Sequence, residues 1–299
     1  MPKDIPVSLP FDPNPRKPRW TLPPGACDTH FHVFGPPHKF PFDAARRYEP
    51  PAAPIEYYLR MQAITGLERG VVVQPTAHGI DNRAILDAIT RSGGRLRGVA
   101  AIDRTTSDAT LTALAAGGIV GARFSLMPDR AGSREAIEHA IPRLLALGWS
   151  LDLHIEPAHL VREAAFIRAL PLTTVIDHMG RFEPAEGLEQ PGFKLLLDLL
   201  RDDRFWTKLC AVDKLTDTPL ANVPDGIPYR DTIPFARAVI AAAPTRVIWG
   251  TDWPHGNTFT PGQVPNDGAL LDLLGEIAPD DATRRRILVD NPARLYGFG

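Results

Sequence analysis

The chain has 299 residues, of which 44% are hydrophobic and 23% charged, a composition typical of a folded protein with one large core. A net charge of −2 and a pI near 6.5 argue against the basic surface that binds nucleic acids or anionic membranes. Two cysteines, Cys27 and Cys210, are too few for a disulfide framework and fit a reducing compartment.

The N-terminal segment, residues 1–24, holds eight prolines with charged residues between them. Proline lacks a backbone N–H, so we expect this segment to form an irregular arm on the body of the protein rather than a helix or strand. The segment has no cationic-then-apolar signal, and no apolar run of roughly 18 residues follows it. We therefore expect a cytoplasmic protein in which residues 25–299 form a single domain.

Apolar, β-branched segments alternate with helical patterns through the rest of the chain. The predicted strands span residues 28–33, 70–74, 96–102, 119–124, 150–156, 173–178, 205–210 and 246–251. The predicted helices include residues 55–64, 82–91, 133–147, 160–169, 192–200 and 233–243. Nearly continuous apolar strands joined by helices are typical of parallel sheets, and eight such units can close a (β/α)8 TIM barrel.

A doubly wound open sheet is the alternative α/β fold. Its dinucleotide-binding form would need a glycine-rich turn after the first strand, where this chain reads V-F-G-P-P instead. The sequence therefore favours the barrel.

The first predicted strand carries two histidines two residues apart, in the sequence C-D-T-H-F-H-V. Because side chains alternate across a strand, His30 and His32 point to the same side. Two converging imidazoles can hold a divalent metal ion or polarise a carbonyl group. A solvated strand face is the plainer alternative.

Further polar residues stand at the carboxyl ends of the other strands, where active sites of such barrels lie. They are Gln74, Thr76, Arg123, His154, His178, Arg181, Asp252 and His255. Four histidines and an aspartate at one end of a barrel suit a metal site or acid–base chemistry. Taken singly, His154 and His178 also fit hydrogen-bonded histidines of the barrel wall, and Asp252 also fits a turn cap. The remaining histidines are expected at the surface, namely His38, His78, His139 and His159.

Three motifs resemble those of a known family. D-T-H-F-H in the first strand, I-D-H-M-G-R in the sixth and W-G-T-D-W-P-H in the eighth resemble the amidohydrolase superfamily. They look most like its branch of 2-pyrone-4,6-dicarboxylate lactonases and 4-sulfomuconolactone hydrolases. The resemblance runs from about residue 18 to residue 296 and includes V-V-Q-P-T-A-H-G-I-D-N and D-N-P-A-R-L-Y.

The resemblance implies a barrel of the amidohydrolase type and a role for each matching residue. His30, His32 and His178 would surround a lactone carbonyl, and Asp252 would be the general base that activates water. The substrate carboxylates would be held by Arg123, Arg130, Arg181, Tyr48 and Thr76. Guanidinium groups bind carboxylates bidentately, which suits a dianionic substrate. Arg130, in the loop P-D-R, equally fits a solvated arginine, and His255 is a further substrate-binding candidate.

Two departures from the family pattern bear on cofactor and substrate. His154 stands where the pyrone dicarboxylate lactonases carry an aromatic residue, and a histidine at this position resembles the metal-dependent relatives. The resulting ligand set is His30, His32, His154 and Asp252, which predicts one divalent ion, with zinc favoured by three imidazoles and a carboxylate. Lys214 replaces a substrate-binding arginine, so we expect an anionic group of different shape, such as a sulfonate.

The predicted function is hydrolysis of a small anionic lactone in bacterial aromatic-compound catabolism, with water activated by Asp252. A metal-dependent decarboxylase on the same barrel is the alternative, since it would need the same ligands. A non-catalytic binding barrel is a third possibility, although the chain holds all the ionisable groups that turnover needs. No helix face in the sequence stands out as a subunit interface.

Overall fold

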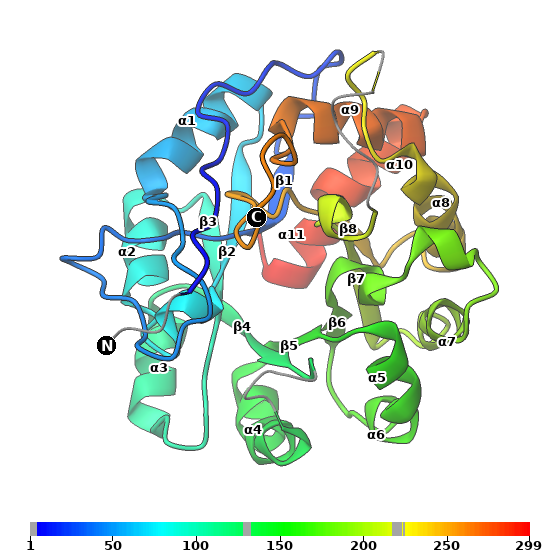
Figure 1. The fold of residues 1–299 in the computed structure, drawn as a ribbon. Coiled ribbons are helices and arrows are strands. Elements are labelled where there is room, and N and C mark those ends of the chain that lie inside the picture. Colours follow the sequence, from blue (N-terminus) through cyan, green and yellow to red (C-terminus); the bar gives the residue numbers. More distant parts are fainter. Residues whose placement is uncertain (1–4, 128–132, 217–222, 224) are drawn as a thin grey trace.

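The computed structural model describes residues 5–127, 133–216, 223 and 225–299. Its centre is an eight-stranded sheet whose order follows the sequence, β1 to β8, and every neighbouring pair is parallel. The strands are β1 (Cys27–Phe31), β2 (Arg69–Val73), β3 (Leu96–Ala100), β4 (Ile119–Ser125), β5 (Ser150–His154), β6 (Thr174–Ile176), β7 (Phe205–Leu209) and β8 (Val247–Trp249). Figure 1 shows the helices arranged around this ring of strands.

The ring closes between β8 and β1 at their carboxyl ends. The backbone N–H of Asp252 donates to the carbonyl of His30 at 2.8 Å, and the N–H of His32 donates to the carbonyl of Trp253 at 2.7 Å. The eight strands thus form the (β/α)8 barrel that the sequence predicts. These two bonds also fix the segment after β8 directly against the two histidines.

Both faces of the strands are buried, which explains why their sequences are nearly continuous in apolar residues. In β2, Val71 and Val73 belong to a small apolar cluster shared with Val99 and Val175 of other strands. Val72, between them, belongs instead to the larger cluster, in which side chains of the helices pack against the outer face of the strands. The alternation follows from the two-residue period of a strand.

The helices cover the outer face of the barrel (Figure 1). They are α1 (Ile55–Thr65), α2 (Arg83–Arg91), α3 (Asp108–Ala116), α4 (Arg134–Leu147), α5 (Pro157–Arg162), α6 (Ala164–Arg168), α7 (Pro191–Leu199), α8 (Ile233–Ala242), α9 (Asp267–Ile277), α10 (Asp281–Arg285) and α11 (Asn291–Tyr296). The single helix predicted at 160–169 was wrong: the segment starts at Pro157 and divides at Glu163, whose φ of −93° and ψ of 12° leave the helical range. Among the described residues, no helix combines the length and apolarity that crossing a bilayer requires.

The N-terminal arm lies on the carboxyl-end side of the barrel and along α9. Arg16 pairs with Asp272 of α9, and the indole N–H of Trp20 donates to the carbonyl of Leu271 at 2.9 Å. In Figure 1 the arm, in dark blue, crosses this side of the barrel past α1. Among residues 5–24 it contains no helix or extended strand.

Candidate active site

The segments at the carboxyl ends of β1 and β8 bring His30, His32 and Asp252 together. The rings of His30 and His32 have centroids 5.1 Å apart. The Nε2 atom of each histidine lies 3.5 Å from Oδ1 of Asp252. His30 is fully buried, whereas His32 and Asp252 keep 9% and 8% of their surface exposed, so only the latter two reach solvent.

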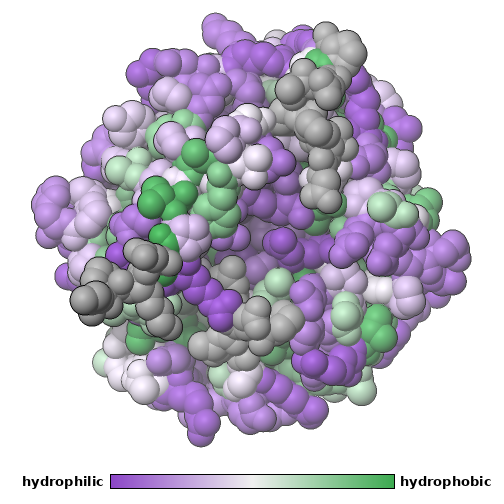
Figure 2. All heavy atoms as spheres, viewed as in Figure 1, coloured by the Kyte–Doolittle hydropathy of each residue, from purple (hydrophilic) through white to green (hydrophobic). Residues whose placement is uncertain are grey.

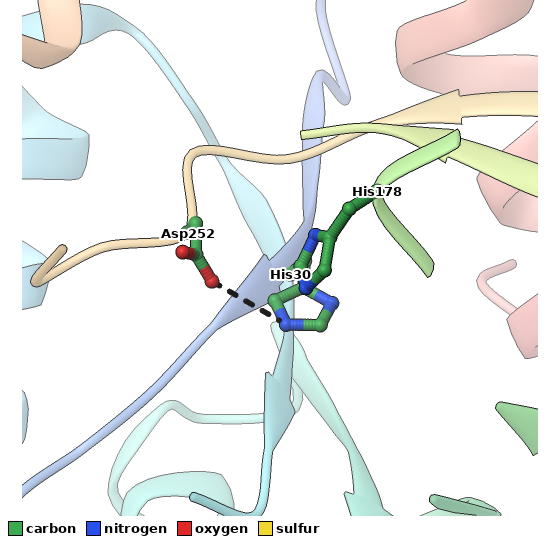
Figure 3. Close-up of side chains that lie close together, drawn as sticks. All are labelled: His30, His178 and Asp252. Atoms are coloured by element: carbon green, nitrogen blue, oxygen red, sulfur yellow. Dashed lines mark ion pairs between the residues drawn. The ribbon is translucent and has the colours of Figure 1, made fainter. Parts of the chain in front are cut away.

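His178 joins this group from a turn of left-handed backbone after β6. The φ angles are +54° at His178, +51° at Met179 and +55° at Arg181. Asp252 is also left-handed, with φ of +63°. Residues other than glycine adopt this region at a cost of about 1–3 kcal/mol each, and such residues concentrate at functional sites. The turn brings the His178 ring within 4.9 Å of His30, centroid to centroid, and Figure 3 shows both rings beside Asp252.

Arg123 of β4 and Cys210, just after β7, contact the two ring nitrogens of His178. Nδ1 lies 2.9 Å from Sγ of Cys210, and Nε2 lies 3.3 Å from Nη2 of Arg123. Because a guanidinium group only donates, Nε2 of His178 accepts and the ring proton sits on Nδ1. Arg123 is itself fixed by Asp177, whose Oδ2 accepts from its Nε at 2.7 Å.

A fully buried lysine, Lys208 of β7, lies beneath the histidines. Its Nζ atom is 2.5 Å from Oδ2 of Asp152, 3.1 Å from Oδ1 of Asp177 and 3.2 Å from Nδ1 of His30. None of these charged residues was predicted from the sequence to belong to the site. Their signal was a charged side chain inside a buried apolar strand, as in F-W-T-K-L-C, since such a charge must be paired.

The electrostatics of the site keep Asp252 and Asp177 ionised and His30 and His178 neutral. Burial would raise the pKa of Asp252, but the surrounding imidazoles of His32, His178 and His30 hold it well below the usual range. Burial likewise opposes ionisation of Asp177, and Lys208 and Arg123 outweigh it to lower that pKa. Burial lowers the pKa of His178 to about 3. At neutral pH the site therefore offers a carboxylate base beside neutral imidazoles.

A cavity of about 80 Å³ opens over these groups. It is lined by His32, Tyr48, Pro75, Thr76, Arg123, His154, His178, Arg181, Lys214, Asp252, Gly256 and Asn257. Most of the sequence-predicted site residues are therefore gathered on one wall or another of this cavity. Figure 2 shows the hollow on this face of the molecule, with hydrophilic residues at its centre.

Two of the lining cations differ in how they are held. No hydrogen bond or ion pair joins the guanidinium of Arg181 to another residue that the structure describes. Burial lowers the pKa of Arg181, although it remains a strong base. Lys214 is oriented instead, because its Nζ donates to Oγ1 of Thr258 and lies 3.1 Å from Oδ2 of Asp213.

Three predicted positions lie elsewhere or outside the described residues. His255 is fully buried and away from the cavity lining, with Nε2 3.1 Å from Oδ1 of Asp267. Arg130 lies outside the described residues. The expectation that His78 is a surface histidine was wrong. It is 2% exposed, and its Nε2 accepts a hydrogen bond from the N–H of Gly35 because the 35–43 segment folds over it.

The metal-ligating atoms gather in a set that differs from the predicted one. Among the described residues, His30, His178 and Asp252 each offer a ligand atom, and these atoms lie within 4.8 Å of one another. The predicted set shares His30 and Asp252 but contains His32 and His154 in place of His178. Nε2 of His30 and Nε2 of His154 are both buried without a hydrogen-bond partner among the described residues. A His/Asp group that could hold a divalent ion is thus present.

Comparison with known proteins identifies the family of this chain. The model of a family described as amidohydrolase matches residues 27–298. The chain belongs to this family. It is 42% identical to a 4-sulfomuconolactone hydrolase from Hydrogenophaga intermedia, over 93% of this chain and 91% of that protein. It is also 42% identical to a 2-pyrone-4,6-dicarboxylate hydrolase from Comamonas testosteroni, over 95% and 93% of the two chains.

A solved structure shows the same likeness in three dimensions. It is that of a putative 2-pyrone-4,6-dicarboxylic acid hydrolase from Pseudomonas putida, which is 30% identical with a TM-score of 0.78. The match covers 92% of this chain and 98% of that one. The barrel of this amidohydrolase is therefore shared with its relatives almost from end to end.

Proposed function

We propose that this amidohydrolase is a lactone hydrolase that opens a small lactone bearing two anionic groups. One observation carries the proposal: an ionised, buried carboxylate contacts two imidazoles in a cavity that three cationic side chains also line. The carboxylate, Asp252, supplies a base for water. The cations, Arg123, Arg181 and Lys214, supply sites for anionic substituents and for the oxyanion. The names of the two relatives, both lactone hydrolases, support hydrolysis over the alternative of decarboxylation.

The reaction begins when Asp252 takes a proton from a water molecule in the cavity. The resulting hydroxide forms a bond to the lactone carbonyl carbon, and the carbonyl electron pair moves to oxygen. When the carbonyl re-forms, the ring C–O bond breaks, and the departing oxygen takes the proton back from Asp252. The sum is addition of one water to give an open-chain acid, which loses a proton at neutral pH.

The developing oxyanion lies among fixed hydrogen-bond donors. Arg123 is held by Asp177 and approaches the cavity beside His178, so its guanidinium needs no rearrangement during the reaction. Preorganised donors of this kind typically contribute a factor of about 10²–10³ to the rate. Tyr48 and Thr76, also on the cavity wall, are placed to bind the substrate body.

The second anionic group of the substrate would bind between Arg181 and Lys214. Lys214 offers a point charge, whereas arginine offers a planar fork matched to a carboxylate. A tetrahedral sulfonate, with three equivalent oxygens, does not need that fork. We therefore propose a sulfonated muconolactone as the preferred substrate and a pyrone dicarboxylate as the poorer one, in line with the names of the two relatives.

The residues of the site also fit a divalent ion, and we propose zinc. The backbone carbonyl of Val73 lies 2.8 Å from Nδ1 of His32 and can only accept, so this nitrogen carries the proton. When the His32 ring carries only this proton, its Nε2 and Oδ1 of Asp252 face each other as lone pairs across 3.5 Å, an arrangement that a shared cation stabilises. His30 and Asp252 would hold the ion, together with histidines from the predicted set, or with His178 if its Nε2 exchanged the Arg123 hydrogen bond for the ion. Such an ion polarises a carbonyl and acidifies water.

For His30 to bind an ion through Nε2, its Nδ1 must carry the proton. Two groups compete for Nδ1: Lys208, which would donate to it from 3.2 Å, and Asp177, which would accept from it at 3.5 Å. Lys208 has two carboxylate partners besides His30, so a shift of its ammonium toward them leaves Asp177 as the acceptor. Carboxylates commonly orient metal-binding histidines in this way.

The test is hydrolysis of 4-sulfomuconolactone and of 2-pyrone-4,6-dicarboxylate by purified protein, with and without a strong chelator. Asp252→Asn should lower kcat by about 10²-fold or more, whereas Asp108→Asn, at an exposed helix start, should not. Release of CO2, or turnover unaffected by Asp252→Asn, would overturn the proposal. Full activity in chelator, with no metal in the purified protein, would rule out the proposed zinc ion. Metal content of His154→Phe against His178→Asn then shows which histidine completes the ligand set.

A further inference from the structure

The N-terminal arm joins two chain segments that both line the mouth of the cavity. One segment precedes α1 and carries Tyr48, and the other follows β8 and carries Gly256 and Asn257. The two segments lie more than 200 positions apart in the sequence. Their relative position is fixed by direct contacts, such as that of the Tyr48 and Phe259 rings, and by what bridges them.

The bridge consists of backbone hydrogen bonds from residues 6–9 of the arm. On one side, the N–H of Ser8 donates to the carbonyl of Glu49 at 2.9 Å, and the N–H of Glu49 donates to the carbonyl of Pro6 at 2.9 Å. On the other side, the N–H of Leu9 donates to the carbonyl of Thr258 at 2.8 Å. Ser8 and Thr258 are only 3% and 4% exposed, so these bonds are shielded from water. Consecutive residues of the arm thus hold both segments of the mouth.

Thr258 connects the arm to a substrate-binding cation. Its hydroxyl donates to the carbonyl of His255 at 2.8 Å and accepts from Nζ of Lys214. The carbonyl of the same residue is the atom that Leu9 binds. A displacement of Thr258 would therefore move the atom that orients the Lys214 ammonium.

The arm also packs beside the catalytic base. The ring of Phe11 lies 4.7 Å from that of Trp253, centroid to centroid, and Trp253 directly follows Asp252. Phe11 is 8% exposed and Trp253 is fully buried. The two segments also approach each other directly, since a side chain at Gly256 would come within 3.1 Å of the Tyr48 hydroxyl.

We propose that residues 6–11 of the arm are a positioning element of the active site. They clasp the Tyr48 segment to the Thr258 segment and thereby place Tyr48 and Lys214 for substrate binding. The inference rests on the proposed function in one respect, since it takes Lys214 and Tyr48 as substrate-binding residues. It concerns binding rather than chemistry, because the arm contacts neither Asp252 nor the histidines in any interaction of the described residues.

The first test removes one backbone donor. Leu9→Pro deletes the N–H that binds Thr258, and Leu9→Ala is the matched control that shortens the side chain but keeps the N–H. One hydrogen bond corresponds to roughly a two- to tenfold effect, so we expect KM of Leu9→Pro to rise by that factor with kcat nearly unchanged. Leu9→Ala should keep the KM of the parent protein. An unchanged KM in Leu9→Pro would overturn the proposal.

The second test acts on Thr258 itself and does not depend on the arm's own folding. Thr258→Val removes the hydroxyl that Lys214 binds, and Thr258→Ser retains it. We expect a raised KM in the valine variant and a KM near that of the parent in the serine variant. A raised KM in both variants would show that packing of the threonine matters rather than its hydroxyl, and would overturn the link to Lys214.

Hydrogen exchange separates this proposal from the proposed function. Backbone amides in the segment after β8 should exchange faster in Leu9→Pro than in Leu9→Ala, whichever substrate the enzyme uses. Faster exchange with a raised KM supports the clasp. Equal exchange in the two variants overturns it. A parent protein that hydrolyses neither lactone would refute the proposed function, and the exchange rates would still decide whether the arm fixes this segment.

Discussion

Replacing Lys208 by methionine should destabilise the fold by leaving a charge unpaired inside the barrel. Methionine has nearly the same length as lysine and carries no charge, so the change removes the ammonium without opening a large cavity. Three groups lose a partner: Asp152 at 2.5 Å, Asp177 at 3.1 Å and His30 at 3.2 Å from Nζ. Lys208 is fully buried, so water cannot replace it.

The size of the effect follows from what each carboxylate keeps. Asp177 retains the guanidinium of Arg123 at 2.7 Å, whereas Asp152 retains, among the described residues, only the hydroxyl of Ser150 at 3.1 Å. Asp152 is therefore the uncompensated charge. Removing one partner of a buried ion pair costs about 3–5 kcal/mol of unfolding free energy. For a protein of this size that corresponds to a drop in Tm of roughly 5–8 °C.

The destabilisation should depend on pH. Burial already raises the pKa of Asp152, and loss of Lys208 would raise it further. A carboxyl whose pKa is higher in the folded state binds more protons there than in the unfolded chain, so stability falls as pH rises through the window between the two pKa values. The variant should therefore be closest to the parent protein in mild acid and furthest from it above neutral pH.

Thermal unfolding followed by circular dichroism, at about pH 5 and about pH 8, measures both effects. Lys194→Met is the matched control, because Lys194 lies on the outer helix α7 with its side chain 59% exposed. The double variant Lys208→Met/Asp152→Asn should recover most of the lost stability, since it removes the orphaned charge. A Tm of Lys208→Met within about 2 °C of the control, or no recovery in the double variant, would refute this reasoning.

Two further predictions concern the segments around β8. Burial lowers the pKa of His255, but Asp267 raises it by more, so the pair stabilises the fold fully below the ordinary histidine pKa and progressively less as pH rises through the elevated one. The gap in urea midpoint between the parent and His255→Asn should therefore be largest near pH 6 and shrink toward about pH 9, and a constant gap would contradict the assignment. Gly250→Ala would place a methyl group 2.7 Å from the backbone N and Cβ of His30, and should cost about 1–3 kcal/mol of stability and much of the activity. Gly299→Ala, whose added carbon meets nothing within 4 Å, is its control, and equal denaturant midpoints in the two variants would contradict the close approach.

The barrel and the meeting of His30, His32 and Asp252 could be predicted because they follow from local rules. Strand alternation places both histidines on one side, and parallel strands in a barrel end at one face. The structure brings all three within 3.5 Å contacts, and it adds Arg123, Arg181 and Lys214 on the same cavity. The roles of these side chains stay predictions, since arrangement alone does not show which of them touch substrate.

The ion pairs of Lys208 with Asp152 and Asp177, beneath the histidines, could not be predicted from the sequence. A lysine in F-W-T-K-L-C and aspartates in L-D-L-H and V-I-D-H announce buried charges, but which charge meets which depends on the register of three strands. Register fixes Lys208 between Asp152 and Asp177, and one residue of slip would turn it toward the helices. The error at His78 has a similar origin, because its burial comes from a distant segment, residues 35–43, that folds over it.

The position of the N-terminal arm could not be predicted from the sequence, for a different reason. Its prolines predict the absence of regular structure, but its contacts with the cavity mouth run through the backbone N–H groups of Ser8 and Leu9 and the carbonyl of Pro6. Nearly every residue carries such groups, so no residue type marks where they dock. Hydrophobic periodicity, the main signal for helices and strands, does not help here either. In this segment the apolar Val7 is exposed and the polar Ser8 is buried, the reverse of the usual pattern. An irregular segment can thus hold an active site together without any motif that reveals it.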